Sequence, residues 1–168
     1  MKPRIRMAIL HAVLAAPLRL LRIATDASAA TRRVWQVLLG LEALVITWLA
    51  LVPAPPVQIT TGWDKSNHAL AFATLAFSSV WALARRPQLP QQWPALALGL
   101  LAYGGAIEIA QTYLPPREGD WMDLLADGVG ISLGLAAASV CASVCASLRA
   151  SLRAPIPAHP VAKSGHER

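Results

Sequence analysis

Four long apolar runs, separated by short polar segments, dominate the chain. They cover residues 34–52, 68–84, 93–114 and 124–148. About 20 apolar residues in a helix are enough to cross the ~30 Å hydrocarbon core of a bilayer. Proline or arginine follows directly after each run. The pattern therefore predicts an all-α membrane protein, a four-helix transmembrane bundle.

The composition supports this interpretation. Hydrophobic residues make up 55% of the chain and charged residues only 14%, whereas soluble domains carry about 25% charged residues. The net charge of +6 raises the question of nucleic-acid binding. However, the basic residues lie in the segments between the apolar runs, which is typical of contact with anionic lipid and of topology control. We therefore expect a membrane partner and no nucleic acid.

The distribution of Lys and Arg predicts the orientation of the bundle. Thirteen of them lie in segments on the same predicted side of the membrane as the N-terminus. Only Lys65 and Arg117 lie in the loops on the opposite side. Loops rich in positive charge stay in the cytoplasm. This bias places both termini in the cytoplasm and makes residues 34–148 a four-span membrane domain.

The two flanks of this domain have different characters. Residues 1–33 form a basic segment in which several polar side chains share one helical face, as in a helix lying in the membrane interface. A cleaved signal peptide or a fifth span remains the alternative for this segment. Residues 149–168 are basic and contain three prolines, which predicts a disordered cytoplasmic tail.

Most of the acidic residues gather where the apolar runs reach the predicted outer face. Six of the nine lie there, together with Lys65, His68 and Arg117. Charges cost several kcal/mol where lipid replaces water, about 2.5 to 3.5 at a helix centre, so such a group is the first place to look for function. We do not assign Glu118, one of these six acids, to the site. The predicted ligand-binding residues are Asp64, Lys65, His68, Glu108, Gln111, Arg117, Asp120, Asp123 and Asp127.

Structural roles compete with ligand binding for some of these residues. Asp64 suits the first turn of a helix, where an acid interacts favourably with the helix dipole. Glu108 lies roughly 9 Å below the outer surface, given 1.5 Å per residue, and we expect it to pair with Arg117 or His68, or to stay protonated. Further along, Gly130 and Gly134 have the GxxxG spacing that permits close helix packing in membranes.

Taken in order, these motifs resemble the VanZ-like family of bacterial membrane proteins. The matching elements are Asp64-Lys65-x-x-His68, Glu108-x-x-Gln111, Arg117, Asp123, and the glycines Gly130 and Gly134. The match covers roughly residues 60 to 135. The family pattern usually has Asn at the position of Asp127, and the extra negative charge shifts the expected preference toward cations. The resemblance implies a bacterial inner (plasma) membrane protein linked to the cell envelope and to glycopeptide (teicoplanin-type) susceptibility, but it supplies no reaction.

Three functions remain open at this point. The first is binding of a membrane lipid, a lipid-linked envelope precursor or a glycopeptide-type ligand, with Arg117 able to grip phosphate. The second is catalysis on such a lipid, with His68 and Glu108 as acid and base or with Asp123 joining them around a metal. The third is assembly with other membrane proteins, without a small-molecule site. Because no HExxH, P-loop or serine elbow occurs in the sequence, we assign no metal, cofactor or catalytic residue.

Overall fold

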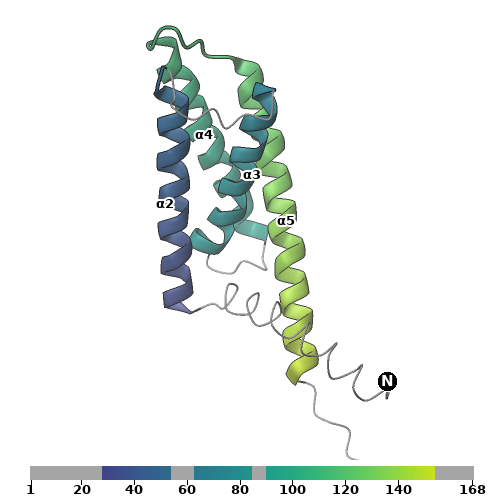
Figure 1. Cartoon of the computed structure of the whole chain (residues 1–168). Helices are drawn as coiled ribbons and strands as arrows, with labels where there is room; N and C mark the ends of the chain where they lie inside the picture. Colours follow the sequence, from purple (N-terminus) through teal and green to yellow (C-terminus); the bar gives the residue numbers. More distant parts are fainter. Residues whose placement is uncertain (1–27, 54–62, 85–89, 154–168) are drawn as a thin grey trace, which may run out of the picture.

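The computed structural model describes residues 28–53, 63–84 and 90–153, and over these residues the protein is all-helical. Consecutive long helices run in alternating directions along one bundle (Figure 1). They are α2 (Ala29–Leu51), α3 (Asp64–Leu83), the short 3-10 turn η1 (Pro90–Gln92), α4 (Trp93–Thr112) and α5 (Trp121–Arg153). The predicted interfacial helix at the N-terminus and most of the predicted C-terminal tail lie outside the described residues.

Three of the described helices, α2, α4 and α5, are long and apolar enough to cross a membrane. This supports a multi-pass membrane protein, as the apolar runs predict. Helix α3 is not among the three, although it has 20 residues. The reason lies in its composition, because its first turns carry Asp64, Lys65 and His68 and its second half carries Ser78 and Ser79.

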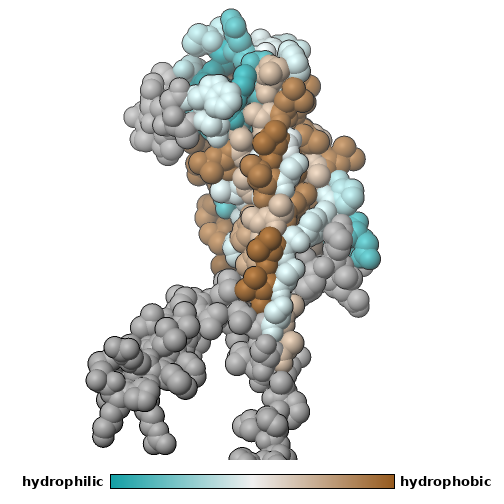
Figure 2. Space-filling model, turned by 90° about the vertical axis from the view of Figure 1, so that its right-hand side faces the viewer, coloured by the Kyte–Doolittle hydropathy of each residue, from teal (hydrophilic) through white to brown (hydrophobic). Residues whose placement is uncertain are grey.

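The core of the bundle is built around α3, which packs most extensively against α5 and also contacts α2 and α4. Its side chains Phe72, Leu75 and Val80 are almost fully buried. Helix α2, in contrast, has no buried residue and exposes a series of Val and Leu side chains. An apolar surface runs along the bundle below a hydrophilic end (Figure 2). Large exposed apolar surfaces of this kind are typical of contact with lipid or with another protein.

Helices α3 and α5 approach each other closely at two glycines. A Cβ atom added at Gly130 would collide with the backbone carbonyl oxygen of Ala69, and one added at Gly134 would collide with that of Ala73. Backbone atoms cannot move aside as a flexible side chain can. The prediction that the GxxxG pair allows close packing of the last span is therefore confirmed.

The helices extend beyond the apolar runs, which corrects two predicted boundaries. Helix α2 begins at Ala29, where the Ser28 side chain accepts a hydrogen bond from the Thr31 N–H at 3.2 Å. Residues 29–33 thus belong to α2, not to the N-terminal segment. Helix α5 continues to Arg153, so residues 149–153 are helical, not part of a disordered tail. Apolar runs predict what suits a lipid environment, whereas caps and local propensity determine where a helix ends.

Candidate functional site

Seven of the nine predicted site residues come together at one end of the bundle, where α2 and α4 end and α3 and α5 begin (Figure 1). The first turns of α3, the last turns of α4 and the start of α5 each contribute side chains. We call these seven residues the polar cluster: Asp64, Lys65, His68, Glu108, Asp120, Asp123 and Asp127. The other two, Gln111 and Arg117, contact α2 instead.

Lys65 connects the start of α3 to the start of α5. Its Nζ atom lies 2.7 Å from Asp120 Oδ2 and 2.9 Å from Asp123 Oδ1 and donates a hydrogen bond to each. Asp120 is also the N-cap of α5, since its Oδ1 accepts from the Met122 N–H at 2.9 Å. The pKa of the Asp120 carboxyl lies below its ordinary value, mainly because of the bond from Lys65 and further because of that from Met122.

His68 lies between two carboxylates of α5 that are one helical turn apart. Its Nδ1 atom is 3.0 Å from Asp127 Oδ1, and its Nε2 atom is 3.7 Å from Asp123 Oδ2. The first distance is a hydrogen bond and the second is only a charge contact. Asp127 has no exposed surface, and Asp123 is only 6% exposed. The imidazole is therefore fixed by a buried partner on one side and faces a second carboxylate on the other.

Two buried carboxylate oxygens in the polar cluster have no hydrogen-bond partner among the described residues. One is Glu108 Oε1, although the other oxygen of Glu108, Oε2, accepts from the Asp120 N–H at 2.7 Å. The second is Asp127 Oδ2. Leaving a buried polar group unpaired costs about 1 to 3 kcal/mol, and more for a charged group. Both atoms therefore mark places where a donor or a cation would be stabilising.

Arg117 and Gln111 hold the end of α2 and do not neutralise Glu108. The Nη2 atom of Arg117 donates to the carbonyl oxygens of Leu49 at 3.1 Å and Val52 at 2.8 Å. Gln111 Nε2 donates to the carbonyl oxygen of Ala50 at 3.1 Å. A cation at the last carbonyls of a helix satisfies unpaired acceptors and interacts favourably with the dipole. The expected pairing of Glu108 with Arg117 was wrong for this reason.

Gly104 also belongs to the site, although it is not among the predicted site residues. A Cβ atom at this position of α4 would collide with Asp127 Oδ2 and would lie 3.1 Å from the ring of Phe72. The absence of a side chain gives the buried carboxylate its space. The available signal was the spacing, because Gly104 lies four residues before Glu108 and so shares its helix face.

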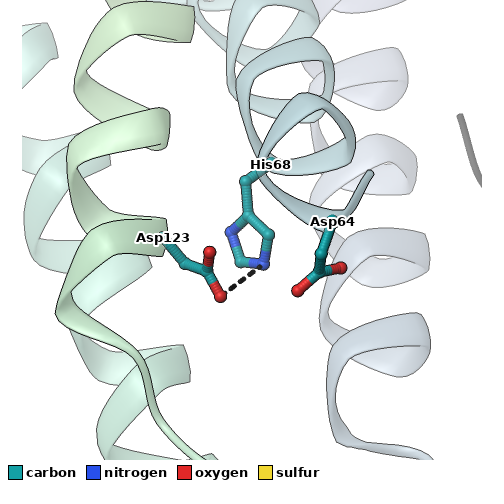
Figure 3. Close-up of side chains that lie close together, drawn as sticks. All are labelled: Asp64, His68 and Asp123. Carbon is teal, nitrogen blue, oxygen red and sulfur yellow. Dashed lines mark ion pairs between the residues drawn. The ribbon is translucent and has the colours of Figure 1, made fainter. Parts of the chain in front are cut away.

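Three members of the polar cluster have the chemistry and the spacing of metal ligands. Asp64, His68 and Asp123 each offer one ligand atom, and these atoms lie within 4.8 Å of one another. The two carboxylates approach the same edge of the imidazole from α3 and from α5 (Figure 3). Asp64 is exposed and His68 is partly exposed, so this edge of the polar cluster is accessible from outside the bundle.

Glu42 lies outside the polar cluster, in α2. Its Oε1 atom accepts a hydrogen bond from the Ser78 hydroxyl at 2.9 Å, and its Oε2 atom is buried without a hydrogen-bond partner among the described residues. It lines an open, mostly apolar groove of about 450 Å³ that α2, α3 and α5 form. The sequence assigned no role to Glu42, and its bond with Ser78 gives it at least a structural one.

Comparison with known proteins adds no family to this picture. No family model matches the chain, and no curated protein or solved structure matches it either. The resemblance to the VanZ-like family therefore stays a prediction from the sequence motifs.

Proposed function

We propose that the chain is a four-span, VanZ-like inner-membrane protein whose polar cluster binds the headgroup of a membrane lipid or of a lipid-linked envelope precursor. In this arrangement α3 is the fourth span, and both termini are cytoplasmic. The burial of α3 between apolar helices supports this, as does the concentration of Lys and Arg at the opposite side.

The observation that carries the proposal is the pair of buried, incompletely satisfied carboxylates of Glu108 and Asp127. Both lie in helices that are apolar enough to span a membrane, and they are 8% and 0% exposed. Charges that serve only to orient helices are expected to satisfy one another, because an unpaired charge in lipid is costly. These two carboxylates each keep one oxygen without a partner among the described residues.

The charges of the polar cluster limit the chemistry of the ligand. Among the described residues, the cationic side chains that contact its five carboxylates are Lys65 and His68, since Arg117 is engaged by the end of α2. A ligand must therefore bring hydrogen-bond donors or positive charge. An amine or a set of sugar hydroxyls meets this condition, and so does a phosphate accompanied by a divalent cation. A phosphate without a cation, held by Arg117 alone, does not.

The direct test is to identify the lipids that purify with the protein. Headgroup-resolved mass spectrometry would compare wild type with Glu108→Gln, which keeps the shape of the side chain, and with Glu118→Gln as the control. Glu118 is an exposed loop residue, so Glu118→Gln removes the same charge at the same end of the bundle without changing a buried side chain. We expect one headgroup class to be enriched over the bulk membrane in wild type and Glu118→Gln and to be lost in Glu108→Gln. Equal lipid content in all three proteins would refute headgroup binding.

One observation favours an enzyme as the second candidate. The hydrogen bond between His68 and Asp127 is the arrangement that orients an imidazole as a general base. The test is the envelope lipid profile of a deletion strain complemented with wild type or with His68→Gln. A lipid species that accumulates in the absence of active His68 would favour catalysis over binding. An unchanged profile, with both proteins present at equal levels, would argue against catalysis.

A further inference from the structure

We infer that Asp64, His68 and Asp123 form a divalent-cation site at the accessible edge of the polar cluster. The inference goes beyond headgroup binding and does not depend on it. The three ligand atoms come from two helices and lie within 4.8 Å of one another. The 3.7 Å between His68 Nε2 and Asp123 Oδ2 suits two ligands of one ion, each about 2 Å from it.

The orientation of His68 is that of a metal ligand. Metal-binding histidines almost always donate the second ring N–H to a carboxylate or a carbonyl, which fixes the tautomer and the ring plane. Here Nδ1 is bonded to the fully buried Asp127 at 3.0 Å. With the proton on Nδ1, the lone pair of Nε2 points toward the space between Asp64 and Asp123 (Figure 3).

Asp123 is also held in the orientation of a metal ligand, by a hydrogen bond to the oxygen that faces away from His68. Its Oδ1 atom accepts the hydrogen bond from Lys65 at 2.9 Å, while Oδ2 faces His68. Lys65 thus positions the carboxylate without occupying the oxygen that would bind the ion. The side chain of Asp64 is exposed in the first turn of α3, so it can rotate toward an ion that the two fixed ligands hold.

A second observation points to a cation independently of these three residues. Glu108 and Asp127, each at least nine-tenths buried, both have an oxygen without a hydrogen-bond partner among the described residues. Asp127 is hydrogen-bonded through its other oxygen to the proposed ligand His68, and Glu108 through its other oxygen to the Asp120 N–H, so the negative charge of these carboxylates lies next to the proposed site. Two positive charges on a bound ion would offset it.

The donor set limits the choice of metal. One imidazole nitrogen and two carboxylate oxygens, with no thiolate, suit Mn²⁺ or Zn²⁺. Three protein ligands also leave coordination positions for water or for an oxygen of a bound headgroup. The structure thus assigns the ion a place where it would both stabilise the carboxylates and contact an incoming ligand.

Mn²⁺ is the better probe, because it has little affinity for the thiols of Cys141 and Cys145. Chelator-treated protein in detergent would be titrated with Mn²⁺, and electron paramagnetic resonance would measure the ion that stays free in solution. We expect one Mn²⁺ per chain for wild type and for the control Glu118→Gln. We expect at least about tenfold weaker binding for Asp64→Asn and for His68→Gln.

Asp64→Asn makes the test independent of folding, because Asp64 is exposed and its substitution leaves the core intact. Thermal unfolding of each variant would verify this. Failure of wild type to bind Mn²⁺, or equal affinity in wild type and Asp64→Asn, would overturn the cation site. Either outcome would leave headgroup binding open, since the lipids that purify with the protein are measured separately.

Discussion

At the scale of single residues, the site depends on how Asp127 is accommodated. Its carboxylate is fully buried, is bonded to His68 on one side and lies against Gly104 on the other. A carboxylate in such a place is costly, and its neighbours must fit it closely. The glycine of α4 is therefore as much a requirement of the site as the histidine of α3.

Replacement of Gly104 by Ala tests this arrangement. The new Cβ would collide with Asp127 Oδ2 and crowd the ring of Phe72, so we expect a loss of about 1 to 3 kcal/mol of stability. Gly105→Ala is the matched control, because a Cβ there meets nothing within 4 Å. It should be neutral or stabilise the helix by up to about 1 kcal/mol. Thermal unfolding in detergent measures both, and equal behaviour of the two variants would contradict the close approach.

Some of these residues could be predicted from the sequence and others could not. Polar residues at the ends of apolar runs are predictable as a cluster, because charges are costly in the hydrocarbon region and gather at its surface or inside the bundle. Lys65, His68 and Asp123 are of this kind. The roles of Arg117 and Gln111 were not predictable, because their partners are backbone carbonyls of α2. Every residue has such a carbonyl, so the sequence does not indicate which one is bonded. Reasoning from side-chain charge alone therefore offered Arg117, beside His68, as a partner of Glu108.

At the scale of helices, the apolar runs predicted where each helix lies along the chain. They did not predict which helix is enclosed by the others and which has an exposed apolar surface. Helix α2 has no buried residue, and most of its exposed large side chains are Val and Leu, although it also carries polar residues such as Glu42. Helix α3 is enclosed by its neighbours, so it tolerates Ser78 and Ser79 in its buried part. A helix in the middle of a bundle contacts protein and little lipid, which is why its hydropathy is the weakest guide to its position.

The close packing of α3 on α5 gives a prediction at this scale. In Gly130→Ala the added Cβ would meet the carbonyl oxygen of Ala69, and the helices would have to separate. We expect a loss of about 1 to 3 kcal/mol and displacement of Asp123 and Asp127 from His68. Gly128→Ala, also in α5, is the control, because its nearest new contact is Leu101 at an ordinary 3.8 Å. Thermal unfolding, together with Mn²⁺ affinity as a measure of the site, distinguishes the two variants, and a fully stable Gly130→Ala protein would refute the tight contact.

At the scale of the whole molecule, the position of α3 determines how many times the chain crosses the membrane. Three helices qualify by length and apolarity alone, and α3 does not. However, α3 lies between the others and supplies much of the core, including Phe72, Leu75 and Val80. A helix that occupies the middle of a membrane bundle must lie at the same depth as its neighbours. Packing therefore favours four spans where hydropathy alone favours three.

The two arrangements predict opposite locations for most of the chain, and this allows a decisive experiment. With four spans and a cytoplasmic N-terminus, reporters fused after Arg86 and after Arg168 both lie in the cytoplasm, and one fused after Glu118 lies outside. With three spans and the same cytoplasmic N-terminus, α3 would stay on the outer side. All three reporter locations would then be reversed. Alkaline phosphatase, active only outside, and green fluorescent protein, fluorescent inside, would be fused at each position. The fusion after Arg168 keeps all the helices that the structure describes, so it carries the most weight. Phosphatase activity at Arg168 would exclude four spans with cytoplasmic termini, and with them the placement of the polar cluster at the outer face.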